Sequence, residues 1–147
     1  LAGSSGSGGT VGVFGGGEHY IDRCYGEDMA IAEGWASFYA AWLNFDLSST
    51  DPGFEYMVPR RAPIKVENIP SDVCGKSTNE WRVIGFLWDL IDLHADPENY
   101  SKPFSTLWND TKGIRASSAG SLKTHLIDRG WDGKALESIW KLNFPAE

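Results

Sequence analysis

The sequence predicts a mainly α protein with about five helices packed around two long ones, and three observations indicate it. A strongly apolar, alanine-rich stretch runs from Met29 to Asp46, and a second apolar stretch with helical spacing begins after Ser77. The C-terminal third contains shorter helical patterns, one of which is closed by Gly130 and one of which is capped by Asp132. With 147 residues, of which 41% are hydrophobic, the chain can bury one core, so we expect a single domain.

Composition divides residues 1–147 into four consecutive segments. We expect a glycine-rich loop over 1–24, a glutamate-bearing helix over 25–47, a long irregular loop over 48–76 and a helical remainder over 77–147. The irregular segment is rich in proline and has only short extended pieces. A long connection of this kind often borders a functional cleft.

The first long helix is expected to begin at 26–28, where two carboxylates favour the positive end of the helix dipole, and to run to about Phe45. Glu33 lies in its middle, among alanine and aromatic residues. Because burying an unpaired carboxylate is costly, we expect a partner group to meet Glu33.

The second long helix is expected to begin with a capping box over 77–80. Its apolar residues recur at helical spacing, which predicts a core-facing stripe of Trp81, Ile84, Trp88 and Ile91. Four charged residues share another face, which is typical of a solvated surface: Arg82, Asp89, Asp92 and Asp96. Three shorter helices are expected at 103–108, 118–129 and 132–142.

Charge and composition exclude several classes of function. The net charge is −7 and the basic residues are scattered, so we expect no nucleic-acid partner. No apolar run is long enough for a membrane span. The two cysteines, Cys24 and Cys74, either form a disulfide, which implies an oxidising compartment, or remain buried thiols.

The sequence Glu33-Gly34-Trp35 resembles the third-ligand helix of the gluzincins, zinc metallopeptidases such as the fungalysin-like and thermolysin-like enzymes. In that superfamily two histidines of an HExxH helix and a later glutamate hold the metal. The resemblance implies that Glu33 is the zinc ligand, that peptides or proteins are the substrates, and that the protein acts in an extracellular, periplasmic or cell-surface setting. It also implies a helical C-terminal half of a zincin-like fold.

The chain departs from the gluzincin pattern in two respects. It has no HExxH, because no two of its histidines, His19, His94 and His125, stand four residues apart. We therefore expect the HExxH helix to lie outside this chain, in an N-terminal portion of the same peptidase, and the chain alone to bind no zinc and to be inactive. Ser37 stands where many gluzincins carry an aspartate that orients a zinc histidine.

Further candidate site residues rest on weaker likenesses. Asp89 and Asp92 belong to an L-W-D-x-x-D phrase that is similar to gluzincin sequences and implies outer-shell support of the zinc ligands; a solvated face is the alternative. His19 ends a glycine-rich G-G-x-H stretch that is also similar to gluzincins. His94 and Tyr100 are candidates for a donor to the oxyanion, without motif support.

Two other functions are compatible with the same residues. A degenerate zincin-like domain without catalytic activity would serve as an interaction module. An unrelated helical protein could instead use some of its seven tryptophans as a platform for a carbohydrate or another ligand.

Overall fold

The computed structural model describes residues 20–55, 61–94 and 99–147, and in these residues it contains five helices and one two-stranded sheet. The helices are α1 (Glu27–Asn44), α2 (Glu80–Asp89), α3 (Phe104–Thr111), α4 (Ala119–Asp128) and α5 (Gly133–Asn143). Strand β2 (Gly53–Phe54) pairs antiparallel with β3 (Ile64–Lys65). The predicted mainly α fold is confirmed. Most of the predicted glycine-rich loop, residues 1–19, lies outside the described residues.

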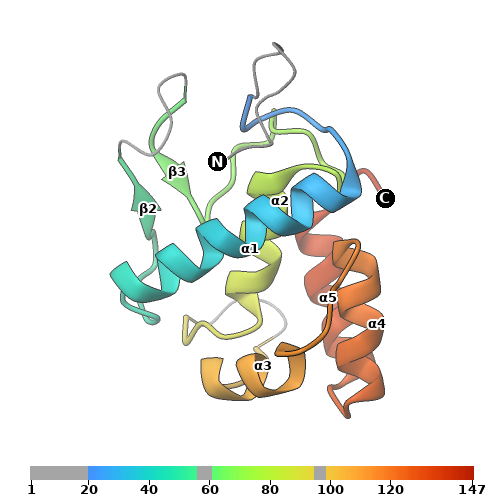
Figure 1. The fold of residues 1–147 in the computed structure, drawn as a ribbon. Coiled ribbons are helices and arrows are strands. Elements are labelled where there is room, and N and C mark those ends of the chain that lie inside the picture. Colours follow the sequence, from blue (N-terminus) through green and yellow to red (C-terminus); the bar gives the residue numbers. More distant parts are fainter. Residues whose placement is uncertain (1–19, 56–60, 95–98) are drawn as a thin grey trace.

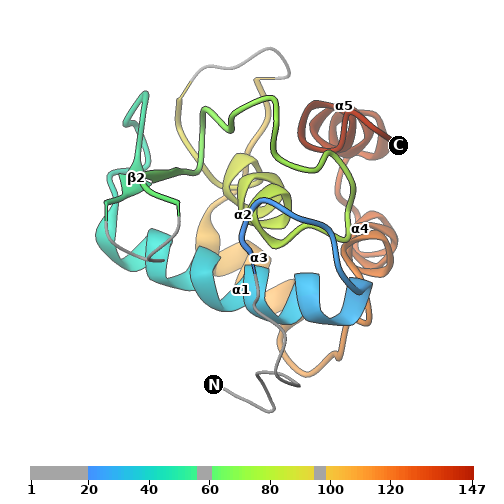
Figure 2. The same ribbon diagram turned by 90° about the horizontal axis from the view of Figure 1, so that it is seen from above.

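Helix α2 forms the centre of the hydrophobic core. Every residue from Trp81 to Asp89 is buried, and α1, α4 and α5 surround it when the molecule is viewed from above (Figures 1 and 2). Among the described elements, α2 makes its most extensive contact with α1. These surrounding helices therefore shield α2 from solvent, and α1 lies on the outside of the molecule.

The approach of α1 to α2 depends on Gly34. A Cβ atom at this position would lie 2.6 Å from Cγ1 of Val83 and 2.9 Å from its Cβ. Carbon atoms pack at about 3.5–4.0 Å, so only glycine permits this crossing without a shift of Val83 or of one helix. The residue directly after Glu33 thus sets the distance between α1 and α2.

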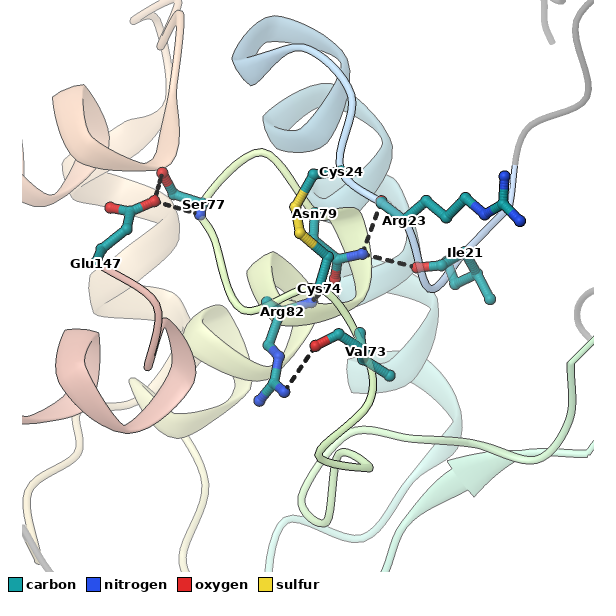
Figure 3. Close-up of a disulfide and its surroundings, with 9 residues drawn as sticks. All are labelled: Ile21, Arg23, Cys24, Val73, Cys74, Ser77, Asn79, Arg82 and Glu147. Atoms are coloured by element: carbon teal, nitrogen blue, oxygen red, sulfur yellow. Dashed lines mark hydrogen bonds between the residues drawn. A yellow bond between two sulfur atoms is a disulfide. The ribbon is translucent and has the colours of Figure 1, made fainter.

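The start of α2 differs from the prediction. The N-cap is Asn79, whose side-chain oxygen accepts a hydrogen bond from the backbone N–H of Arg82 at 2.7 Å. Ser77 does not cap the helix: its backbone N–H and hydroxyl both donate to the carboxylate of Glu147, at 2.6 and 2.7 Å (Figure 3). The expected capping box is wrong because Ser77 instead donates its hydrogen bonds to a carboxylate 70 positions away.

A disulfide ties the segment before α1 to the segment before α2 (Figure 3). It joins Cys24 and Cys74, whose Cα atoms lie 5.8 Å apart. Beside it, the Asn79 side-chain amide donates to the backbone carbonyls of Ile21 and Arg23, both at 2.9 Å. Helices α1 and α2 therefore start from a common cross-linked and hydrogen-bonded junction. Only α1 is long, with 18 residues; α2 has 10, fewer than the 11 of α5, so the expectation of a second long helix is wrong.

Three residues of the predicted charged face are buried, so the interpretation as a solvated surface is wrong for Arg82, Asp89 and Asp92; Asp96 lies outside the described residues. The Arg82 guanidinium donates to the Val73 carbonyl at 3.1 Å, and burial lowers its pKa. The Asp89 carboxylate accepts a hydrogen bond from Asn143 of α5 at 2.7 Å. Segments distant in sequence cover this face and supply its polar partners.

The three C-terminal helices form close to the predicted ranges. Ser118 and Ser121 form a reciprocal capping box at the start of α4, and Asp132 accepts from the backbone N–H groups of Lys134 and Ala135 at the start of α5. Among the described helices, none has both the length and the apolar character needed to cross a bilayer.

Candidate functional site

Glu33 lies on the exposed side of α1. It is the only charged residue between Met29 and Leu43, a stretch that is otherwise almost entirely apolar. A helix that is apolar all round is normally buried on all sides. Yet α1 is exposed at five positions of this stretch: Ala32, Glu33, Ala36, Tyr39 and Leu43. The helix therefore presents a single carboxylate on an apolar surface.

Small residues accompany Glu33 along this surface. Ala36 and Ala40 lie one and two turns further along the helix, and Leu43, which is 61% exposed, ends the row. Helices approach each other to about 8–10 Å, and small side chains give the shorter distances. This row, the exposed α1 face, can thus accept another helix close to the Glu33 carboxylate.

Ser37 is buried, at 8% exposure, whereas Glu33 is exposed. It shares the side of α1 occupied by Gly34, three residues earlier, which contacts Val83 of α2. The hydroxyl is therefore directed to the core side of the helix. The expected contact of Ser37 with a zinc histidine stays a prediction.

Asp89 and Asp92 are brought together with a third carboxylate, Glu67, from the loop before α2. One carboxylate oxygen from each residue lies within 4.8 Å of the others. Both aspartates are buried, and Asp89 is directed toward Asn143 of α5. An all-carboxylate set is the type of site preferred by Ca²⁺ or Mg²⁺, and differs from the two imidazoles and one carboxylate of a gluzincin zinc site.

Sequence reasoning missed Glu67 in this cluster. Asp89 and Asp92 are three residues apart, so their placement on one side of a helical turn was predictable. Glu67 follows the short strand β3 in an irregular segment, where no periodicity indicates the direction of a side chain. Only the folding of this loop back over α2 brings the three carboxylates together.

The candidate donors occupy separate places. His94 is half-buried just after α2, and His19 lies outside the described residues. Tyr100 packs edge-on against Trp131, and its hydroxyl accepts a hydrogen bond from the backbone N–H of Asp132 at 3.2 Å. The hydroxyl of Tyr100 thus already supports the start of α5.

A pocket of about 340 Å³ opens beside the exposed α1 face, between α1, α3 and α4. Ala32 and Trp35, the neighbours of the Glu33–Gly34 pair, form one wall. Trp108 of α3, which is 44% exposed, lies in another wall. The sequence did not predict this pocket, because its walls come from segments that are far apart in the chain and meet only in the folded protein.

Comparison of the chain with protein-family models, with curated proteins and with solved structures found no match.

Proposed function

We propose that this chain is the C-terminal part of a zinc-dependent metallopeptidase of the gluzincin type, in which Glu33 is the carboxylate ligand of the metal. The observation that carries the proposal is that Glu33, the one charged residue between Met29 and Leu43, lies on the exposed side of a helix that is otherwise almost entirely apolar over this stretch. The resemblance of Glu33-Gly34-Trp35 to the gluzincin third-ligand helix supports the same role. The proposed partner is an HExxH helix from the N-terminal portion of the same peptidase.

The residues of α1 fit this role. The small side chains of Ala36 and Ala40 allow a second helix to approach closely enough for ligands on both helices to reach one ion. Zinc held by two imidazoles and a carboxylate would acidify a bound water for attack on a peptide carbonyl. The contribution of this chain is to fix Glu33 on a helix that Gly34 anchors against the buried α2.

Metal analysis of the longest natural precursor that contains residues 1–147 tests the proposal. The parent precursor is expected to bind zinc stoichiometrically, and Glu33→Gln is expected to remove most of it because an amide is a much weaker zinc ligand. Glu27→Gln is the matched control, since Glu27 is an exposed glutamate in the first turn of the same helix. Circular dichroism of each variant establishes that the helices are retained.

Two results would overturn the proposal: absence of zinc from every form of the precursor, or equal zinc content in Glu33→Gln and the parent. Hydrolysis of a quenched fluorescent peptide should follow the zinc content across the same variants. A folded precursor that carries zinc but hydrolyses no peptide would identify the inactive zincin-like interaction domain instead.

One observation favours a ligand-binding module as a second candidate function. Tyr39, Trp42, Phe104 and Trp108 form a continuous aromatic array on α1 and α3, in which Trp42 and Phe104 stack with ring centroids 3.8 Å apart. Tyr39 is 40% exposed. Aromatic faces of this kind bind sugars, so quenching of tryptophan fluorescence by oligosaccharides, and its loss in Trp108→Leu, tests this alternative.

A further inference from the structure

The pocket beside α1 has the size and lining of a site for a large apolar group. Its volume of about 340 Å³ lies within the range of known small-ligand sites. Seven of its residues are apolar: Ile31, Ala32, Trp35, Trp108, Ile114, Ala116 and Leu122. Ile114 and Trp108 are 39% and 44% exposed, so apolar surface remains in contact with solvent when the pocket is empty. Filling it with an apolar side chain would remove that surface from water.

Two cationic side chains at the pocket would favour a ligand that also carries a negative charge. Lys112 and Arg115 line the same pocket and are exposed. Gly113 adopts a left-handed conformation, with φ of 84°, and the backbone N–H of Ile114 donates to the Thr111 carbonyl. The two cations therefore flank Gly113 and Ile114 in the sequence of this turn, in the loop that lines the pocket.

Among the residues that the structure describes, no carboxylate forms an ion pair with either cation. In the described ranges the ion pairs involve four other basic residues, namely Arg61, Lys65, Lys123 and Arg129. The acidic residue nearest in sequence, Asp110, accepts hydrogen bonds from Trp131 and Arg129 instead. The protein has a net charge of −7, so two basic side chains beside an apolar pocket stand out from the rest of the chain. Together they match a ligand in which an apolar group lies next to an anionic one.

We propose that this pocket binds a large apolar side chain of a peptide, and that Lys112 and Arg115 select a carboxylate on a residue next to it. The inference deepens the proposed function and rests on it, because a pocket walled by Ala32 and Trp35 adjoins the proposed metal ligand and is placed to receive part of a peptide substrate. The substrate class is therefore peptides with an aromatic or large aliphatic residue flanked by aspartate or glutamate.

Calorimetric titration of this chain with short blocked peptides tests the inference without zinc or catalysis. The probes are acetyl-Asp-Phe-Asp-amide, its Asn-Phe-Asn counterpart and its Asp-Ala-Asp counterpart. Loss of the carboxylates should weaken binding about threefold to tenfold, as for exposed or partly exposed ion pairs. Loss of the phenyl ring should weaken it about tenfold or more. About 1 M NaCl, which shortens the Debye length to about 3 Å, should abolish the preference for the acidic peptide.

Variants separate the two parts of the pocket. Lys112→Gln with Arg115→Gln should remove the preference for the acidic peptide, while Lys134→Gln, an exposed lysine at the start of α5, should leave it unchanged. Ala32→Phe should block entry of the phenyl ring; Ala32 is exposed, so the larger side chain displaces no core residue. Circular dichroism controls for folding.

Equal affinity for the acidic and amide peptides, or no measurable binding of any peptide, would overturn the inference. Binding of laurate in place of the peptides would show that the pocket accepts an anionic lipid and would also overturn it. The proposed function fails separately, through the zinc content of the precursor. A zinc-loaded precursor that hydrolyses acidic and amide peptides equally well would leave the proposed function standing and this inference refuted.

Discussion

Replacing Gly34 by alanine tests whether α1 and α2 cross as closely as the structure indicates. The added Cβ would lie 2.6 Å from Cγ1 of Val83, about 1 Å inside the normal carbon–carbon contact distance. Relieving such a clash in a packed core costs about 1–3 kcal/mol. Alanine improves helix propensity by about 0.5–1 kcal/mol, which offsets part of this cost. We therefore expect Gly34→Ala to lower the free energy of unfolding by about 0.5–2 kcal/mol.

Gly120→Ala provides the matched control. Gly120 lies within α4, where an added Cβ would meet its nearest atoms at an ordinary 3.7 Å. Only the propensity effect then operates, so this variant should be as stable as the parent or more stable by up to about 1 kcal/mol. Urea unfolding followed by tryptophan fluorescence measures both variants. A gain of stability in Gly34→Ala that equals the gain in Gly120→Ala would refute the close crossing.

A double-mutant cycle with Val83→Ala identifies the clashing atom. Removing Cγ1 and Cγ2 of Val83 eliminates the contact at 2.6 Å but retains the Cβ contact at 2.9 Å. In that background Gly34→Ala should cost less by about 0.5–1.5 kcal/mol, the coupling energy of residues in direct contact. Additive effects would show that the penalty of Gly34→Ala arises elsewhere.

Three further predictions concern the junction before α2 and the start of the C-terminal helices. Cys24→Ser with Cys74→Ser should lower the free energy of unfolding by about 2–4 kcal/mol, because the disulfide links positions 50 apart; an unchanged urea midpoint would contradict this. Asn79→Ala removes both the cap of α2 and two amide hydrogen bonds and should cost about 2–3 kcal/mol, whereas Asn79→Asp retains the cap and should cost less; thermal melts that do not distinguish the two would refute the division. The hydrogen bond from the Trp131 indole N–H is the largest cause that lowers the pKa of Asp110. A hydrogen bond and the positive charge of Arg129 lower this pKa further. Since the folded-state pKa lies below the unfolded value of about 3.9, this stabilisation is complete above about pH 4 and is lost as the pH falls through the folded pKa. In acid titrations Asp110→Asn should therefore lose less stability than the parent, and parallel stability curves would show that Asp110 contributes nothing.

Local sequence patterns determined the helices and several of their ends. The apolar stretch from Met29 onward predicted α1, the pattern over 118–129 predicted α4, and the cap residue Asp132 predicted the start of α5. Caps and helical periodicity act over three or four residues. A short window of sequence therefore contains the physical information that sets these elements.

The start of α2 shows where local patterns fail. Ser77 and Asn79 are both good N-cap residues, and no local pattern favours the second. The fold brings the Glu147 carboxylate to Ser77 and the carbonyls of Ile21 and Arg23 to the Asn79 amide. Contacts across the whole chain thus decided which residue caps the helix.

For the candidate site, the sequence determined the chemistry of individual residues, and the tertiary structure decided which of them meet. Glu33 was identifiable from its apolar surroundings, but its exposure is set by the packing of Gly34 against Val83. The carboxylate of Glu67 and the cations of the loop between α3 and α4 carried no sequence signal. Their placement depends on segments far apart in the chain, since the burial of α2 folds those segments around one apolar helix.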